Sequence, residues 1–256
     1  MRKVAPVAGA VAVALGLGAV ALAAAPRPAA PLPQGSEPVT LDPADFTMRI
    51  DNPYWPMRPG TRWIYVETDR AGSRRRDVVT VTHRTKTVAD GVTARVVRDV
   101  ATEDGTVVEA TDDWYAQDKD GNVWYLGEAT TEYENGRPKS TAGSFEAGVN
   151  GAQPGIIMAA APKPGLRYRQ EYSKGQAEDA GVVMSVDERV QVPYRFFPRR
   201  VLMTKDVNRL EAADVEFKFY ARGVGPVLAI TVAGGSDRED LIAVRRGRQP
   251  APAALG

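Results

Sequence analysis

The residues with the clearest chemical potential lie in and after the sequence Asp-Lys-Asp-Gly-Asn. Asp118, Asp120 and Asn122 stand two residues apart, and Glu128 follows them. Carboxylate and amide oxygens on a short loop suit calcium, which takes several oxygen ligands. The loop is not an EF-hand, because its glycine, Gly121, stands at loop position four rather than six. We therefore hypothesise a calcium site here. The alternative is a hairpin turn with solvated acids beside it.

Four aromatic residues flank this turn symmetrically. They are Trp114 and Tyr115 before it and Trp124 and Tyr125 after it. Aromatic side chains on paired strands stabilise a hairpin by packing across it. The same rings would also serve as a platform on which a sugar stacks. The pattern thus predicts either cross-strand packing or ligand binding.

An apolar stretch interrupts the otherwise polar connections of the chain. Residues 154–162 run Pro-Gly-Ile-Ile-Met-Ala-Ala-Ala-Pro and read as a loop. Loops are usually polar, so Ile156, Ile157 and Met158 must pack on a sheet, cap a cavity or face a partner. We include these three residues among the candidate ligand-binding residues.

Residues for nucleophilic catalysis are scarce. The chain has one histidine, His83, and no cysteine. Alternation places His83 on the same face as Val79 and Val81, which predicts a half-buried strand residue. A serine triad would need this histidine, but no Gly-x-Ser-x-Gly elbow is present. Thiol catalysis, disulfides and thiolate metal sites are excluded. We predict no catalytic residue from these types.

Paired carboxylates leave one enzymatic function open. Glycoside hydrolysis needs two acids at a set separation, and the chain has 32 acidic residues. Glu128, Glu146 and Glu171 are the candidates, because they lie beside aromatic residues or the long loop. The alternative for each is ordinary surface charge.

The elements that must position these residues are β-strands. Asp-Gly and Asn-Gly pairs recur every 10 to 15 residues between β-rich runs, and they tolerate the positive φ of tight hairpin turns. No amphipathic helix of three turns is evident. We predict an all-β fold, an antiparallel up-and-down meander that forms a strongly curved sheet or an open barrel. A sandwich is the second choice. The expected strands are 61–67, 76–87, 93–102, 106–118, 123–134, 166–173, 182–194, 199–207, 215–220, 227–232 and 241–245.

The ends of the chain predict export. Residues 1–25 carry two basic residues, an uncharged apolar run and an Ala-Leu-Ala cleavage pattern, as in a signal peptide. An uncleaved membrane anchor is the alternative. Residues 26–42 are rich in Pro and Ala and predict an extended tether. We expect residues 43–248 to form a single β domain and residues 249–256 to form a disordered tail. We expect a protein that is secreted or held in the cell envelope.

The charge balance argues against nucleic acid as a partner. The chain has 33 basic and 32 acidic residues, and loss of Arg2 and Lys3 with the signal would leave it slightly acidic. The only basic run, residues 74–76, fits a solvated hairpin tip better than a phosphate-binding surface. We expect no nucleic-acid partner, and contact with a membrane only through an uncleaved signal.

Several phrases together resemble a family of exported bacterial proteins with no assigned function. The resemblance covers residues 51–230 and implies export and a β-rich fold, but it transfers no catalytic residue. The phrases are DNPYWPMRPGTRWIY from residue 51, DWYAQDKDGNVWYLGE from 113, PGIIM from 154, YRQEY from 168 and YARGVG from 220.

The function that fits best is a non-enzymatic binding protein that holds an apolar small molecule or an envelope component in its curved sheet. One alternative is a calcium-stabilised carbohydrate-binding module. The other is a secreted hydrolase with two carboxylates.

Overall fold

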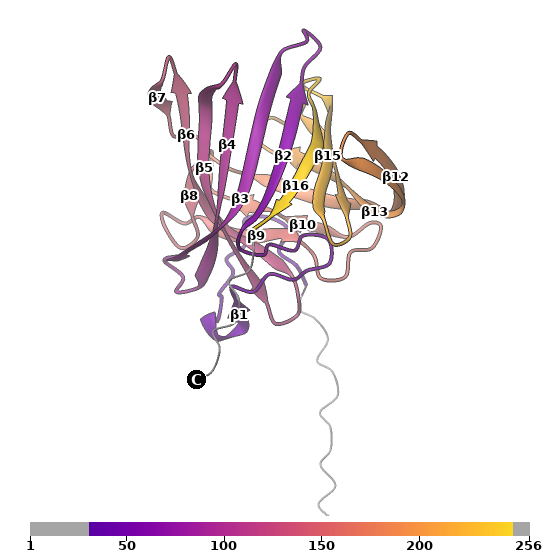
Figure 1. Cartoon of the computed structure of the whole chain (residues 1–256). Coiled ribbons are helices and arrows are strands. Elements are labelled where there is room, and N and C mark those ends of the chain that lie inside the picture. The colour runs from indigo at the N-terminus through magenta and orange to yellow at the C-terminus, as the bar shows by residue number, and fades with distance from the viewer. Residues whose placement is uncertain (1–30, 248–256) are drawn as a thin grey trace, which may run out of the picture. The chain divides into compact units, whose positions relative to one another are not determined.

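The computed structural model describes residues 31–247, which contain sixteen strands and one short 3₁₀ helix (Figure 1). The signal peptide and the C-terminal tail predicted from the sequence lie outside these residues. The elements are η1 (Pro43–Asp45), β1 (Phe46–Thr47), β2 (Thr61–Thr68), β3 (Arg74–Thr87), β4 (Thr93–Glu103), β5 (Thr106–Asp118), β6 (Val123–Glu134), β7 (Arg137–Ser140), β8 (Phe145–Glu146), β9 (Gln153–Met158), β10 (Arg167–Arg169), β11 (Glu171–Tyr172), β12 (Asp179–Val192), β13 (Arg195–Asn208), β14 (Val215–Ala221), β15 (Gly225–Ala233) and β16 (Arg238–Arg246).

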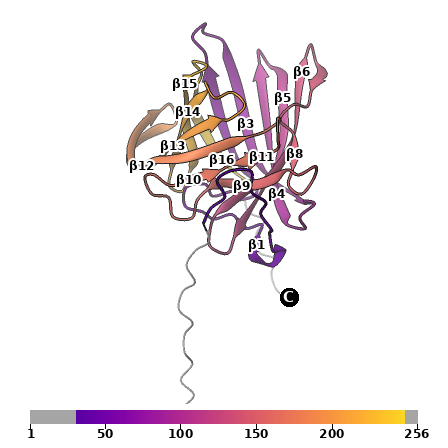
Figure 2. The same cartoon turned by 180° about the vertical axis from the view of Figure 1, so that it is seen from behind.

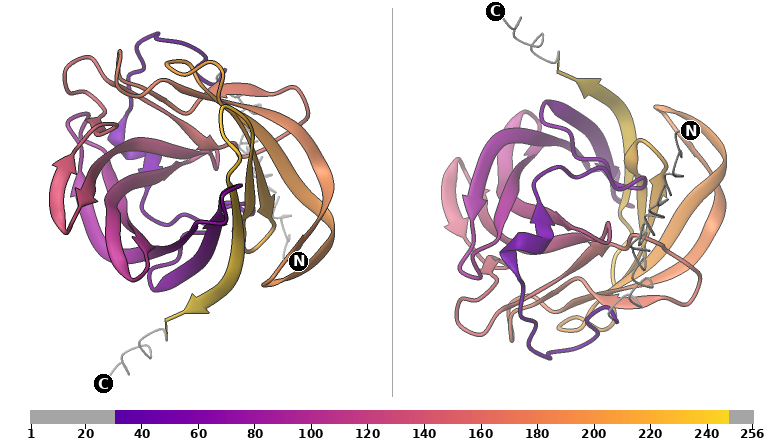
Figure 3. Two further views of the ribbon diagram at one scale, coloured as in Figure 1. Left: turned by 90° about the horizontal axis from the view of Figure 1, so that it is seen from above. Right: turned by 90° about the horizontal axis from the view of Figure 1, so that it is seen from below.

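One antiparallel sheet curls into a nearly closed barrel. Its strand order is β10-β12-β13-β14-β15-β16-β2-β3-β4-β5-β6-β9-β11. Most neighbours in this order are also consecutive in sequence, so the sheet is an up-and-down meander. Views along the barrel show the strands surrounding a common interior (Figure 3). The predicted all-β class and the open barrel are thus confirmed.

The hairpin turns predicted from Asp-Gly and Asn-Gly pairs are present. Asp104 and Gly105 have φ of 49° and 81°, and Asn135 and Gly136 have φ of 53° and 72°. Asp, Asn and Gly tolerate this left-handed region better than other residues, and two such residues in succession match the twist of a two-residue hairpin. These turns fix the register of the β4–β5 and β6–β7 hairpins.

The barrel has a single seam, at which β10 and β11 form the two ends of the sheet. These strands are separated in sequence by Gln170 alone, so the chain itself crosses the seam (Figure 2). The crossing is tight. A Cβ atom on Gly155 of β9 would lie 2.3 Å from the carbonyl oxygen of Gln170, so no side chain fits at that position.

Residues 31–42, the described part of the predicted tether, are bound to the barrel at this seam. The buried guanidinium of Arg169 donates to the carbonyl oxygens of Gly35 and Glu37, and also to that of Pro154 in β9. The backbone N–H of Arg169 donates to the carbonyl of Pro33. One side chain thereby joins the N-terminal segment to both sides of the seam.

The next part of the chain, residues 50–57, closes one end of the barrel. We call it the plug. Asn52 is buried and anchors the plug, because its Nδ2 donates to the carbonyl oxygens of Gly121 and Ala159 at 3.0 and 3.2 Å. The backbone N–H groups of Asp51 and Asn52 both donate to Oε1 of Gln117.

Two expectations about elements are wrong. The apolar stretch at 154–162 begins as strand β9 and is not a loop, because it pairs with β6 through Trp124 and Val123. His83 is exposed rather than half-buried. A register shift between Val81 and Thr85 breaks the alternation on which that expectation rested. Within residues 31–247, no helix is long and apolar enough to cross a bilayer.

Candidate functional site

Along the barrel axis, the inward-facing residues change from aromatic and apolar types to acidic ones. Because side chains alternate between the two faces of a strand, residues two apart share the interior. On β2 the series is Trp63, Tyr65, Glu67, and on β14 it is Tyr220, Lys218, Glu216. The inward pairs on β3, β4 and β5 follow the same rule: Val79 and Asp77, Val97 and Asp99, Tyr115 and Asp113. An apolar layer therefore lies next to the plug, and an acidic layer lies beyond it.

A cavity of about 390 Å³ occupies this interior. This volume lies within the range of small-molecule sites, roughly 300–1,000 Å³. The plug contributes Trp55 and Met57 to its lining, and β9 contributes Ile157. A second cavity of about 310 Å³ adjoins the first and shares with it four lining residues, Glu216, Lys218, Thr231 and Asp237.

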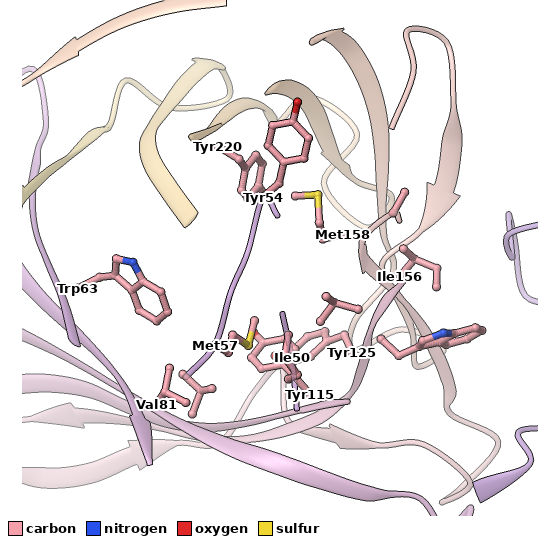
Figure 4. Packing of buried hydrophobic residues seen from close by; sticks show 14 of the residues in the cluster. Ile50, Tyr54, Met57, Trp63, Val81, Tyr115, Tyr125, Ile156, Met158 and Tyr220 are labelled. Atoms are coloured by element: carbon pink, nitrogen blue, oxygen red, sulfur yellow. The ribbon is translucent and has the colours of Figure 1, made fainter. Parts of the chain in front are cut away.

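The apolar layer is built from aromatic rings of separate segments. The ring centroid of Trp55 lies 5.8 Å from that of Tyr115 and 5.6 Å from that of Tyr220, so the plug joins opposite walls. Trp63 Nε1 donates to the carbonyl oxygen of Val224 at 2.7 Å. Figure 4 shows Trp63, Tyr115 and Tyr220 around the same interior region. The hydrogen bond and the ring contacts hold these rings in fixed positions.

The acidic layer contains carboxyl groups with raised pKa values. Burial, followed by repulsion from Asp77, raises the pKa of Asp99 well above its usual value. The same two causes raise the pKa of Glu239 to about 8. Within the described residues, Oδ1 of Asp77 and Oδ1 of Asp99 are buried without a hydrogen-bond donor. Repulsion by Asp77 therefore adds to burial in favouring the protonated form of Asp99.

A second acidic group centres on Tyr125. Its hydroxyl oxygen lies 2.7 Å from Oδ1 of Asp113 and 2.9 Å from Oε2 of Glu128. One hydroxyl proton can serve only one of these contacts, so the other hydrogen bond needs a protonated carboxyl. Burial raises the pKa of Asp113 to about 8 and that of Glu128 to about 7. Strongly perturbed pKa values in a cavity are typical of functional sites.

Lys218 lies where the two cavities meet. Its Nζ is 3.0 Å from Oε2 of Glu216 and 3.3 Å from Oδ2 of Asp206. Burial alone would lower the pKa of Lys218, but attraction by these two carboxylates outweighs it and raises the pKa well above its usual value. Lys218 is therefore a charged ammonium and not a free amine nucleophile.

The four aromatic residues predicted to bind ligand fall on two faces of the sheet. Tyr115 lines the cavity, and Tyr125 stacks on it with centroids 5.0 Å apart. Trp114 lies between the inward-facing Asp113 and Tyr115, and the Lys86 ammonium lies 4.3 Å from its ring centroid. Trp124 donates from Nε1 to Asp118. Of the four, the structure thus brings Tyr115 to the cavity wall, with the buried Tyr125 packed against its ring.

The residues predicted to bind calcium have other partners. Both carboxylate oxygens of Asp118 accept hydrogen bonds, from the backbone N–H and Nδ2 of Asn122 and from Trp124. Oδ1 of Asn122 accepts from the N–H of Ala160, and Asp120 is exposed. Glu128 contacts Tyr125 instead. Across residues 31–247, no group of three or more His, Cys, Asp or Glu residues is placed to hold a metal ion.

The remaining candidate residues, three on β9 and two glutamates, lie in different environments. Ile156 and Met158 are fully buried in the core, whereas Ile157 lines the cavity. Glu171 is interior, and burial together with Asp179 raises its pKa well above its usual value. Glu146 pairs with Lys86 outside the cavity, at 3.0 Å.

Most of the acidic layer, and Lys218, are not evident from the sequence. Asp77, Asp99, Glu216 and Lys218 lie within strands expected from the sequence, and Glu239 lies in a stretch, residues 237–240, whose sequence indicates a solvated turn. A signal was present for four of them, because Asp77, Asp99, Lys218 and Glu239 each lie two residues from an apolar or aromatic residue, whereas Glu216 lies two residues from Lys218. The acidic layer can be recognised only when the inward face of each strand is known.

Comparisons with known proteins give a distant structural resemblance. No family model and no curated protein matches the sequence. The chain is similar to a "putative exported protein with YmcC-like fold" from Bacteroides fragilis, with 13% identity, a TM-score of 0.46 and coverage of 75% of this chain and 99% of the other. It is also similar to a "putative lipoprotein" from Parabacteroides distasonis, with 13% identity, a TM-score of 0.41 and coverage of 75% and 98%. At this level of similarity, neither structure assigns a function to the chain.

Proposed function

We propose that the protein is an exported binding protein that holds a small molecule inside its barrel. Support for export comes from the signal-like residues 1–25. Support for binding comes from one observation above all, which is the cavity of about 390 Å³ next to the plug. The apolar layer would take the apolar part of the ligand, as the sequence led us to expect.

The construction of the cavity favours binding over mere imperfect packing. Protein interiors normally leave few voids larger than a water molecule. Here the lining includes buried aromatic rings held by specific contacts and carboxyl groups with strongly raised pKa values. Convergent polar groups on an apolar floor are typical of ligand sites.

The proposal is tested by filling the cavity. Val79 lines the cavity from β3, so Val79→Trp should block it. Val232→Trp is the matched control, because Val232 is 49% exposed on β15. We expect the neutral fluorescent probe N-phenyl-1-naphthylamine to bind the wild type and the control but not Val79→Trp, with all three proteins folded by circular dichroism. Equal binding to all three, or to none, would contradict the proposal.

A second candidate, a two-carboxylate hydrolase, is favoured by the contacts of Tyr125 with Asp113 and Glu128. Their pKa values, about 8 and about 7, suit a general acid near neutral pH. A panel of 4-nitrophenyl glycosides tests this candidate. Release of nitrophenol that Asp113→Asn abolishes would establish it, and no release would count against it.

A further inference from the structure

The acidic half of the interior holds more carboxyl groups than the one cation that lines it can balance. Ten carboxylate side chains line the two adjoining cavities, and Lys218 is the one basic residue among the described residues that line them. Uncompensated buried carboxylates are costly, and they relieve the cost by taking up protons or by pairing with a cation. The raised pKa values of Asp99 and Glu239 show that proton uptake is favoured at these two groups.

Lys218 shows how carboxylates of this cavity pair with a cation. Its ammonium lies 3.0 Å from Glu216 and 3.3 Å from Asp206, and attraction by these two carboxylates keeps it charged. The environment at the junction of the two cavities therefore stabilises an ammonium group. A second ammonium brought by a ligand would meet the same kind of surroundings.

Free acceptor atoms are available for such a group. Asp206 is 6% exposed, and its Oδ1 finds no hydrogen-bond donor among residues 31–247, although its Oδ2 accepts from Gln170. In the first cavity the carboxyl groups of Asp77 and Asp99 lie against each other, and Oδ1 of each lacks an N–H donor among the described residues. A buried acceptor without a donor is unfavourable. The N–H groups of a ligand ammonium would satisfy these atoms.

The apolar layer supplies aromatic surface beside the acidic layer. Trp55, Trp63 and Tyr115 present ring surface to the cavity next to the carboxylates. Aromatic faces attract cations as well as apolar groups. The cavity thus offers apolar surface and negative charge on adjoining walls.

We infer that the ligand is an organic cation, a protonated amine attached to an apolar body. The ammonium lies among the carboxylates of the acidic layer, and the body lies on the rings beside the plug. This inference rests on the proposed function, because it names the chemical class of the ligand that the barrel holds.

The test compares two probes that differ in one group. 1-Naphthylmethylamine and 1-naphthylmethanol share the ring, but only the amine carries a positive charge near neutral pH. Calorimetric titration of the full chain with each probe should give an affinity at least about tenfold higher for the amine, since hydrogen bonds between charged groups are about twice as strong as neutral ones. Asp99→Asn and Glu239→Gln should each reduce amine affinity several-fold and leave the alcohol unaffected.

Glu134→Gln is the matched control, because Glu134 lies on β6, is 63% exposed at its side chain and pairs with Lys139 outside the cavity. It should change neither affinity, and thermal melting should show that each variant is folded. Equal binding of amine and alcohol would overturn the inference and leave the proposed function standing. Failure of both probes, together with N-phenyl-1-naphthylamine, to bind the folded protein would overturn both. Loss of amine binding in Glu134→Gln would show that surface charge, and not the cavity, attracts the amine.

Discussion

Asp113 and Asp118 lie five residues apart on the same strand but have opposite environments. Asp118 accepts three hydrogen bonds at the turn, so its charge is well satisfied. Asp113 is 9% exposed and has one hydroxyl, that of Tyr125, within hydrogen-bond distance. Hydrogen bonding stabilises a carboxylate, and burial without enough donors favours the neutral acid. Sequence spacing alone drew attention to Asp118, whereas the interior placement singles out Asp113.

Asp113→Asn should raise stability at alkaline pH. The pKa of Asp113 is about 8 in the folded protein and near 3.8 in an unfolded chain, so the folded state must bury a charge at about pH 9. Asparagine removes that charge and can still accept from Tyr125. We expect a gain on the order of 2–5 kcal/mol at about pH 9 and a change within about 1 kcal/mol at about pH 5, measured by urea unfolding.

The control for this variant is Asp120→Asn, an exposed acid in the adjacent turn. It should leave stability nearly unchanged at both pH values. A loss of stability in Asp113→Asn at alkaline pH would show that the carboxylate is better satisfied than its contacts indicate.

At the scale of elements, the hairpins were predictable and β9 was not. Strands β5 and β6 have the bounds expected from the sequence, because a turn with Asp or Gly at positive φ separates two β-rich runs. Strand β9 is flanked by Gly, Ala and Pro and lacks polar alternation, so it reads as a loop. Its apolar run is explained by burial on one face and the cavity on the other.

Two neighbouring isoleucines of β9 test that placement. Ile156→Ser puts a hydroxyl into the fully buried core and should cost on the order of 3 kcal/mol or more. Ile157→Ser alters a half-buried residue that lines the cavity, so it should cost less but weaken uptake of N-phenyl-1-naphthylamine.

Each isoleucine serves as the control for the other, since the substitution and the strand are the same. Denaturant unfolding and probe fluorescence should therefore give opposite rankings of the two variants. The same ranking in both measurements would mean that Ile157 is core and not cavity wall.

At the scale of the whole molecule, closure of the barrel depends on contacts that no local pattern reveals. Arg169 reaches the carbonyl of Glu37 across 132 positions of sequence. Composition marked residues 26–42 as a tether because Pro and Ala carry little periodicity. The acidic layer is likewise distributed over β2, β3, β4, β5, β14 and β16, each of which contributes one or two residues. The fold class follows from strand and turn patterns in the sequence. The site depends on which faces of distant strands point into the barrel and lie together there.

The pH dependence of stability should carry the signature of these carboxyl groups. The pKa values of Asp113, Glu128 and Glu239 are raised to about 8, about 7 and about 8, so between about pH 4 and pH 8 the folded state binds more protons than the unfolded state. Stability must then fall as pH rises through this range. We expect a higher melting temperature at about pH 5 than at about pH 9. A melting temperature that rises steadily with pH would show that these groups are ionised in the folded protein.

The N-terminal segment at the seam also bears on self-association. The outer edge of β10 would present unpaired backbone groups, but Pro33 accepts from the N–H of Arg169 and Gln34 donates to the carbonyl of Arg167. An uncovered sheet edge is a template onto which a strand of another molecule can add. A chain shortened to begin at Asp42 should therefore form dimers or larger aggregates through this edge, visible by light scattering. In this view, residues 31–41 protect the protein from pairing with its own copies.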